Sequence, residues 1–156
     1  MKQPLRILTL VIAAIVPPAS AQQPAQTKPP VGVPADARQF NGNWYRAYHE
    51  KISWKQAAER CRILGGRLGV ILDEPTNAFI KQLAEGLPLW LGATDEKAKG
   101  VWMWVDGTRM SYKAWAPGQP QGAKKEDYLM FGDGQWYDAF GGEPKVVGFI
   151  CEWPRK

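Results

Sequence analysis

The chain contains two cysteines, Cys61 and Cys151, which lie far apart among its 156 residues. In an exported chain, an even pair of cysteines is more often a disulfide than a metal-binding or catalytic pair. A bridge between them would close a loop of about 90 residues and, in the chain-entropy model, restrict the unfolded chain by about 4 to 5 kcal/mol. The sequence therefore favours a fold that one disulfide stabilises strongly, provided that the chain is exported.

The N-terminus has the pattern of an export signal. Two basic residues and an apolar run over residues 7–16 precede Ala19-Ser20-Ala21, a small-residue cleavage pattern. The run is well short of the about 20 residues that span a bilayer, so a membrane anchor is the less favoured interpretation. We therefore expect residues 1–21 to be a signal peptide and the mature protein to be secreted or extracytoplasmic, with no membrane span.

Residues 22–39 are rich in Gln, Pro and Ala and contain almost no large apolar side chains. Such a composition cannot offset the entropy of ordering, so we expect a flexible Pro/Gln-rich linker. The folded domain is then expected to cover residues 40–156, without an internal repeat. Loss of the signal peptide leaves 18 basic and 15 acidic residues, mixed along the chain. This balance argues against a nucleic-acid partner.

Two helices are predicted in the first half of the domain. Ser53 and Gln56 form a capping-box pattern, and apolar residues recur at helical spacing until Gly65-Gly66. This first helix carries Cys61 on its apolar face. Asp73 is expected to cap a second helix, which has a proline in its first turn.

Short aromatic or β-branched runs, separated by turn residues, predict strands in the rest of the domain. The expected strands cover residues 68–72, 89–93, 102–105, 128–131, 135–137 and 146–153. Residues 111–127 are polar and rich in Pro and Gly, without a regular period. A loop of that length is usually functional or mobile. Two helices followed by strands and a long loop predict an α+β domain.

The order of these features resembles the C-type lectin-like domain family between about residues 40 and 153. The matching motifs are Asn43-Trp44-Tyr45, Ser53-Trp54, Leu89-Trp90-Leu91-Gly92, Trp102-Met103-Trp104-Val105-Asp106-Gly107, Trp115 with Pro117-Gly118-Gln119-Pro120, and Val147-Gly148-Phe149-Ile150-Cys151-Glu152. The resemblance implies an α+β fold with two helices, short antiparallel strands and a long irregular loop region. It also implies a disulfide between Cys61 of the first helix and Cys151 of the last strand. The tryptophans expected to pack in the core are Trp54, Trp90, Trp102, Trp104 and Trp136.

The main calcium and sugar site of this family combines a triplet with a cis proline, a glutamate a few residues on, and a Trp-Asn-Asp triplet. The resemblance places Gln119-Pro120-Gln121, Glu126 and Trp136-Tyr137-Asp138 at these positions. The implied calcium ligands are Gln119, Gln121, Glu126 and Asp138. Calcium takes six to eight oxygen ligands, and Tyr137 stands where the family has an amide ligand. The set of oxygen ligands is therefore reduced, and two interpretations of the loop stay open. The loop either binds calcium or is solvated and coordinates nothing.

A second calcium site of the family is less well matched. Asp95 and Asp127 stand at its acidic positions, but Lys99 and Gly122 stand where further acidic residues would be expected. We therefore expect no calcium at this second site.

Aromatic residues beside the loop are candidates for sugar contact, because an exposed ring suits the apolar face of a pyranose. The ligand-binding set is Trp115, Gln119, Pro120, Gln121, Glu126, Tyr137 and Asp138. The first interpretation is a secreted lectin-like module that binds a carbohydrate or glycoconjugate, with a galactose-type preference and at most one weak calcium site. The alternative is a calcium-independent module that binds a protein or another surface.

An enzyme is not expected. His49 is the single histidine and is expected on the strand that Asn43-Trp44-Tyr45 begins, which resembles the first strand of the family, and a surface imidazole is the favoured interpretation there. No nucleophile can be paired with a base, and so small a domain has few walls for a substrate cleft.

Overall fold

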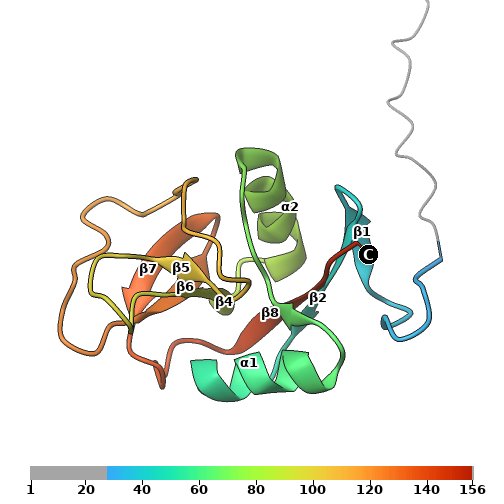
Figure 1. The fold of residues 1–156 in the computed structure, drawn as a ribbon, viewed down its shortest axis with the longest axis horizontal. Helices are drawn as coiled ribbons and strands as arrows, with labels where there is room; N and C mark the ends of the chain where they lie inside the picture. Colours follow the sequence, from blue (N-terminus) through green and yellow to red (C-terminus); the bar gives the residue numbers. More distant parts are fainter. Residues whose placement is uncertain (1–27, 156) are drawn as a thin grey trace, which may run out of the picture.

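The computed structural model describes residues 28–155, so the expected signal peptide and the first part of the expected linker lie outside the described residues. Within this range the chain forms two helices and eight strands (Figure 1). In chain order they are β1 (Arg38–Phe40), β2 (Asn43–Tyr48), α1 (Trp54–Ile63), β3 (Arg67–Leu68), α2 (Glu74–Ala84), β4 (Leu89–Thr94), β5 (Met103–Trp104), β6 (Tyr128–Gly132), β7 (Gln135–Ala139) and β8 (Gly148–Trp153).

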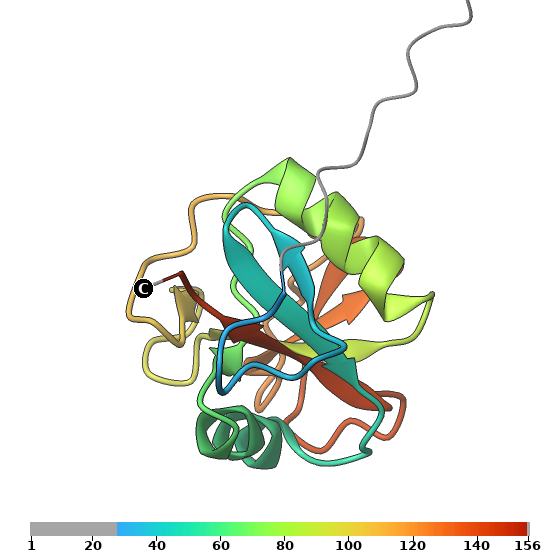
Figure 2. The ribbon, with the colours of Figure 1, turned by 90° about the vertical axis from the view of Figure 1, so that its right-hand side faces the viewer.

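The strands form one sheet in the order β1-β2-β8-β4-β6-β7, with β3 paired to β8 and β5 paired to β4. The two helices lie on opposite sides of the strands (Figures 1 and 2). The predicted α+β fold with two helices is confirmed. One pairing differs from the antiparallel expectation, because β4 and β8 run parallel, with Leu89 opposite Gly148 and Trp90 opposite Phe149.

Both helices begin where the sequence predicts. The Ser53 N–H donates to Gln56 Oε1 at 2.9 Å, and the Gln56 N–H donates to Ser53 Oγ at 3.4 Å, which completes the capping box of α1. The Thr76 N–H donates to the Asp73 carboxylate at 2.8 Å at the start of α2. The strand predicted over residues 68–72 is shorter than expected. In the structure β3 covers only Arg67–Leu68.

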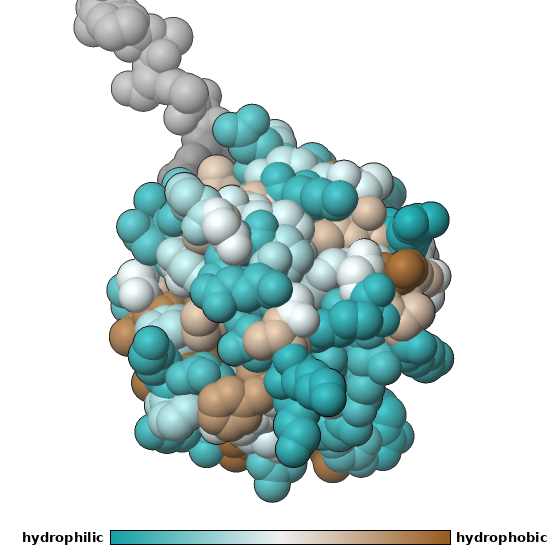
Figure 3. Space-filling view, turned by 90° about the vertical axis from the view of Figure 1, so that its left-hand side faces the viewer, coloured by the Kyte–Doolittle hydropathy of each residue, from teal (hydrophilic) through white to brown (hydrophobic). Residues whose placement is uncertain are grey.

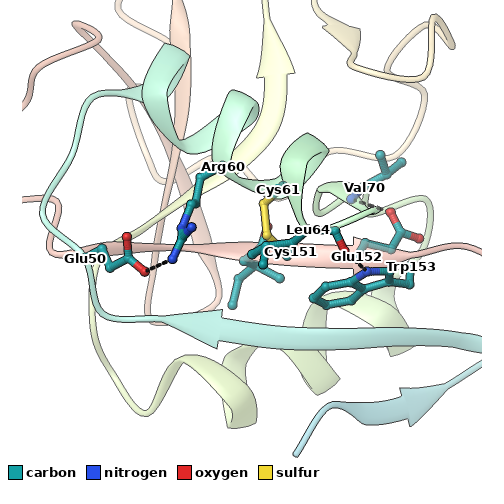
Figure 4. Close-up of a disulfide and its surroundings, with 9 residues drawn as sticks. Glu50, Arg60, Cys61, Leu64, Val70, Cys151, Glu152 and Trp153 are labelled. Atoms are coloured by element: carbon teal, nitrogen blue, oxygen red, sulfur yellow. Dashed lines mark hydrogen bonds and ion pairs between the residues drawn. A yellow bond between two sulfur atoms is a disulfide. The ribbon is translucent and has the colours of Figure 1, made fainter. Parts of the chain in front are cut away.

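The expected disulfide joins Cys61 of α1 to Cys151 of β8 (Figure 4). The two Cα atoms are 5.5 Å apart, and neither side chain is exposed. The strand β8 pairs with β2, β3 and β4, so the bridge fixes α1 to the centre of the sheet. The five tryptophans expected in the core are all buried.

The N-terminal edge of the fold begins earlier than residue 40. The strand β1 starts at Arg38, and its partner β2 places Tyr45 opposite that residue. Ala37 is buried, and Val33 packs against the same core cluster. The expected boundary therefore falls inside β1. Among the described residues, neither helix is long and apolar enough to cross a membrane.

A buried carboxylate lies beside the disulfide. Glu152 of β8 is 1% exposed and accepts four hydrogen bonds. The donors are Asn43 Nδ2 (2.8 Å), the Tyr45 hydroxyl (3.2 Å), Arg67 Nε (3.1 Å) and the Val70 N–H (3.1 Å). Burial raises the pKa of the Glu152 carboxyl, and the bond and charge of Arg67 offset part of that rise. The carboxylate therefore connects β2, β3 and β8 through one side chain.

Candidate functional site

The long loop over residues 111–127 lies at the end of the molecule that carries β5, β6 and β7 (Figure 1). The surface at this end is mostly hydrophilic, with apolar residues scattered over it (Figure 3). The loop has little regular structure, although Trp115 makes an isolated bridge with Trp136 of β7. The Gln119–Pro120 peptide bond is cis, as the family resemblance implies.

Asp138 of β7 attaches this loop to the sheet. Its two carboxylate oxygens accept from the Gln121 N–H at 2.9 Å and from the Gly122 N–H at 2.7 Å. In return, the Asp138 N–H donates to Gln119 Oε1 at 3.3 Å. The structure thus brings together Gln119, Gln121 and Asp138, three of the residues that the sequence predicts at the site. Their contacts hold the loop in place through the protein's own hydrogen bonds.

Glu126 and Tyr137 have different surroundings. Among the described residues, no donor reaches Glu126 Oε2, although this atom is buried. Tyr137 is half-buried, and its hydroxyl lies 3.5 Å from Gln135 Oε1. Glu126 is therefore the one carboxylate of the predicted set that retains an uncommitted oxygen.

The predicted ligand set does not fit a calcium ion. Calcium takes six to eight oxygens, and its affinity rises with the number of charged ligands. Both oxygens of Asp138 already accept backbone hydrogens, and so does Gln119 Oε1. Tyr137 contributes a neutral phenol, which leaves Glu126 as the single free carboxylate. Within residues 28–155, no group of three or more acidic, histidine or cysteine side chains is arranged to hold a metal.

At the second family site, a lysine lies where a cation would be expected. Lys99 Nζ is 2.7 Å from the Glu126 carbonyl oxygen, 2.9 Å from Asp127 Oδ1 and 3.4 Å from Asp95 Oδ1. Asp95 is buried, and its second oxygen accepts from the Gly100 N–H at 2.7 Å. Partial burial acts to lower the pKa of Lys99, but its bond to Asp127 and the charges of both aspartates outweigh burial and raise it. The ammonium group therefore connects residues 95–100 to the end of the long loop.

Replacing Lys99 by methionine is expected to loosen the end of the long loop. The change leaves two aspartates without their shared cation while keeping an unbranched side chain that is one heavy atom shorter. Because Lys99 is 40% exposed, we expect a modest effect, about a fivefold faster amide hydrogen exchange in residues 122–127. Exchange measured by mass spectrometry tests this. The exposed neighbour Lys97, replaced by methionine, provides the control. Equal exchange in the Lys99 and Lys97 variants would contradict the role of Lys99 in holding the end of the long loop.

Trp115 does not join the set around Asp138. Its ring meets Trp102 and Trp136 edge-on, with centroid separations of 4.9 and 5.9 Å. It instead lines a groove of about 370 Å³ together with residues of α2 and of the turn between β6 and β7. The lining residues are Glu74, Asn77, Ala78, Lys81, Tyr112, Ala114, Trp115, Asp133, Gly134 and Gln135. We name this feature the α2 groove.

Sequence reasoning missed most of the α2 groove. The residues 74, 77, 78 and 81 follow helical spacing, so they lie on one face of α2. The polar face of this amphipathic helix was the one feature of the sequence that indicated part of the groove. Nothing in the sequence predicted that this face lies beside residues 112–115 and 133–135.

The lone histidine, His49, follows β2 and is exposed.

Known proteins resemble the chain over most of its length. A family model for the lectin C-type domain matches residues 50–153. The perlucin-like protein of Mytilus galloprovincialis is 33% identical over 154 residues, which cover 93% of this chain and 95% of that protein. The matched range begins just before α1, ends with β8 and includes every residue of the predicted site.

Solved structures show the same fold. The cow C-type carbohydrate-recognition domain of CD23, crystallised in the presence of a GlcNAc2Man3 oligosaccharide, superimposes with a TM-score of 0.73 at 28% identity and covers 80% of this chain and 97% of its own. The crystal structure of a calcium-independent type II antifreeze protein superimposes with a TM-score of 0.72 at 25% identity, covering 78% of this chain and 94% of its own. Both structures extend over most of the described residues.

Proposed function

The chain belongs to the family of lectin C-type domains, and we propose that it is an extracytoplasmic module that binds carbohydrate at its long loop without using calcium. The members of this family are non-enzymatic binding domains, so the protein is a binding protein and not an enzyme. One observation carries the proposal. The Asp138 carboxylate accepts hydrogen bonds from the backbone N–H groups of Gln121 and Gly122 in the loop. These two hydrogen bonds support a loop edge that needs no metal ion to hold it.

The loop edge offers groups that suit sugar hydroxyls. Glu126 is half-buried, its buried Oε2 has no donor among the described residues, and the side chain of Gln121 is exposed. The amide nitrogen of Gln119 adds a donor, since its Oε1 already accepts from Asp138. A hydroxyl group can donate to Glu126 and accept from the amides at the same time. Gln119-Pro120 resembles the galactose-type form of the family triplet, so we propose a preference for galactose-like sugars.

The proposed location is outside the cytoplasm, with residues 1–21 acting as a signal peptide that is cleaved after Ala21. The disulfide between Cys61 and Cys151 supports this location, because such bonds form and persist in oxidising compartments.

Glycan binding in calcium and in EDTA tests the proposal. We expect the full mature chain to bind galactose-terminated glycans on an array with equal strength in the two buffers. Glu126→Gln should weaken the binding about tenfold, because a hydrogen bond to a charged acceptor becomes a weaker bond to a neutral amide oxygen. Glu85→Gln, at an exposed position beyond α2, is the matched control and should bind as the wild type does.

Each other outcome contradicts a stated part of the proposal. Binding that disappears in EDTA would show that calcium is required. A folded domain without any glycan signal would reject the carbohydrate ligand and leave a module that binds a protein or another surface. Equal binding by wild type and Glu126→Gln would move the contact away from the loop edge.

A further inference from the structure

The α2 groove is formed by three segments that lie apart in the sequence. Helix α2 contributes Glu74, Asn77, Ala78 and Lys81, and the other walls come from residues 112–115 and from the turn at residues 133–135. Its volume of about 370 Å³ falls within the roughly 300 to 1,000 Å³ that is usual for small-molecule sites. The groove therefore has room for a sugar ring, and it is separate from the cluster around Asp138.

Buried hydrogen bonds hold the base of the α2 groove. Asn77 is 8% exposed, and its Nδ2 donates to the Gly134 carbonyl oxygen at 2.8 Å. Its Oδ1 accepts from Trp136 Nε1 at 2.9 Å, and Trp136 is fully buried. One side chain thus joins α2, the β6–β7 turn and the core. A ligand entering the groove meets walls that are already fixed, which reduces the entropy lost on binding.

Two aromatic rings line the α2 groove in fixed positions. Tyr112 and Trp115 meet Trp136 edge-on, with interplanar angles of 82° and 84°. Both are half-buried, so each ring keeps some surface on the groove side. Burial raises the pKa of the Tyr112 hydroxyl, and the negative charges of Glu74 and Asp73 add to the rise. The hydroxyl therefore stays protonated and can donate.

The polar rim of the α2 groove carries both donors and acceptors. Glu74, Asp133 and Gln135 supply oxygens, and Lys81 supplies an ammonium that is 3.2 Å from Asp133 Oδ1. The lysine and the aspartate are 53% and 78% exposed, so their ion pair is weak and can open for a ligand. Two carboxylates against one lysine disfavour an anionic ligand such as a sulfated or uronic sugar.

We infer that the α2 groove is a second binding site of this domain and takes one neutral pyranose ring. Aromatic rings on one wall suit the apolar C–H face of a pyranose, and the carboxylates, the amide and the lysine of the rim suit its hydroxyls. The inference rests on the proposed function only in taking the ligand to be a carbohydrate. It assigns Trp115 to this groove and not to the loop edge.

A steric block of the α2 groove tests the inference without touching the core. Ala78 is exposed on α2 and lines the groove, so Ala78→Gln fills part of the space while the helix keeps a good helix former. Ala78→Ser is the matched control. The uniformly labelled mature chain would be titrated with methyl β-galactopyranoside, methyl α-mannopyranoside and cellobiose, and the indole and backbone amide signals would be followed by NMR.

At least one of the three sugars is expected to shift the indole signals of Trp115 and Trp136 and the amides of residues 133–135 in a saturable way. Ala78→Gln should weaken that binding about tenfold, and Ala78→Ser less than about twofold. Trp115→Ala should also weaken it about tenfold, because a stacking surface is lost. Gln135→Ala, at an exposed rim position, provides a variant that does not disturb the aromatic core.

The outcomes separate this site from the loop edge. Shifts confined to Gln121, Gly122 and Glu126 would overturn the groove and leave the proposed function standing. Groove shifts that Ala78→Gln leaves unchanged would also overturn it. Groove shifts in a protein without a glycan signal from the loop edge would support the groove and contradict the proposed loop site. No shift with any of the three sugars would overturn the groove whatever the array shows.

Discussion

A variant in which both Cys61 and Cys151 are alanine is expected to lose about 4 kcal/mol of unfolding free energy. The bridge joins residues 90 positions apart, and in the chain-entropy model a loop of that length restricts the unfolded chain by about 4 to 5 kcal/mol. Both sulfur atoms are fully buried, so their removal also leaves unfilled space between α1 and β8. Since small domains have only about 5 to 15 kcal/mol of stability, this loss would leave the fold marginal.

Urea denaturation of the oxidised protein and of the double-alanine variant measures this effect. Wild type in excess dithiothreitol is the matched control, because it lacks the bridge but keeps both sulfur atoms. We expect the reduced wild type to fall close to the variant. A loss below about 1 kcal/mol in both would show that the loop is already restricted in the unfolded chain, and the entropy argument would then fail.

Replacing Glu152 by glutamine is expected to lower the unfolding free energy by about 3 kcal/mol at neutral pH. The carboxylate accepts from Arg67 and Val70 with one oxygen and from Asn43 and Tyr45 with the other. An amide keeps one acceptor and turns its NH2 group toward two donors, so buried groups lose their partners. Removing one partner of a largely buried ion pair adds to this loss, because Arg67 keeps a single carboxylate contact, to Asp106.

The pH dependence of stability gives a second test of Glu152. Burial raises its pKa above the ordinary value of 4.5, so the folded state holds this proton more tightly than the unfolded state does. The corresponding contribution to stability is complete below pH 4.5 and is lost as the pH rises through the folded pKa. The gap in unfolding free energy between wild type and Glu152→Gln should therefore narrow as the pH increases from 4.5 to 7.

Denaturation of the two proteins across this pH range measures the narrowing, and Glu85→Gln is the control for an exposed glutamate. A gap that widens with pH would mean that hydrogen bonds to the carboxylate outweigh its burial. In that case the four donors, and not the surrounding core, would determine the proton affinity of Glu152.

The sequence predicts those parts of the fold that depend on short-range patterns. Ser53 with Gln56 and the capping residue Asp73 mark the helix starts, because each cap accepts from a backbone amide three residues away. The disulfide also follows from the chain, since a pair of cysteines in a chain expected to be exported leaves few alternatives. The parallel pairing of β4 with β8 could not be predicted, because short apolar strands look alike whichever direction their neighbours run.

The candidate site was harder to predict than the fold. Family resemblance located Gln119, Gln121 and Asp138 together, but it could not show that the Asp138 carboxylate bonds to loop amides. Whether a carboxylate meets a metal or a backbone N–H depends on loop geometry at the scale of an ångström. The α2 groove was out of reach for another reason, because its walls come from segments up to about 60 residues apart in the sequence.

Lys99 supplies a positive charge between Asp95 and Asp127 that belongs to the chain itself. A free ion enters and leaves a protein by mass action, so the fraction of sites it fills follows its concentration in the medium. The ammonium of Lys99 is covalently part of the chain and meets Asp95 and Asp127 as soon as the polypeptide folds. Dilution and chelators cannot remove it, and its raised pKa keeps it charged beyond the ordinary lysine range. The contact that Lys99 makes between residues 95–100 and the end of the long loop therefore does not depend on the concentration of divalent ions.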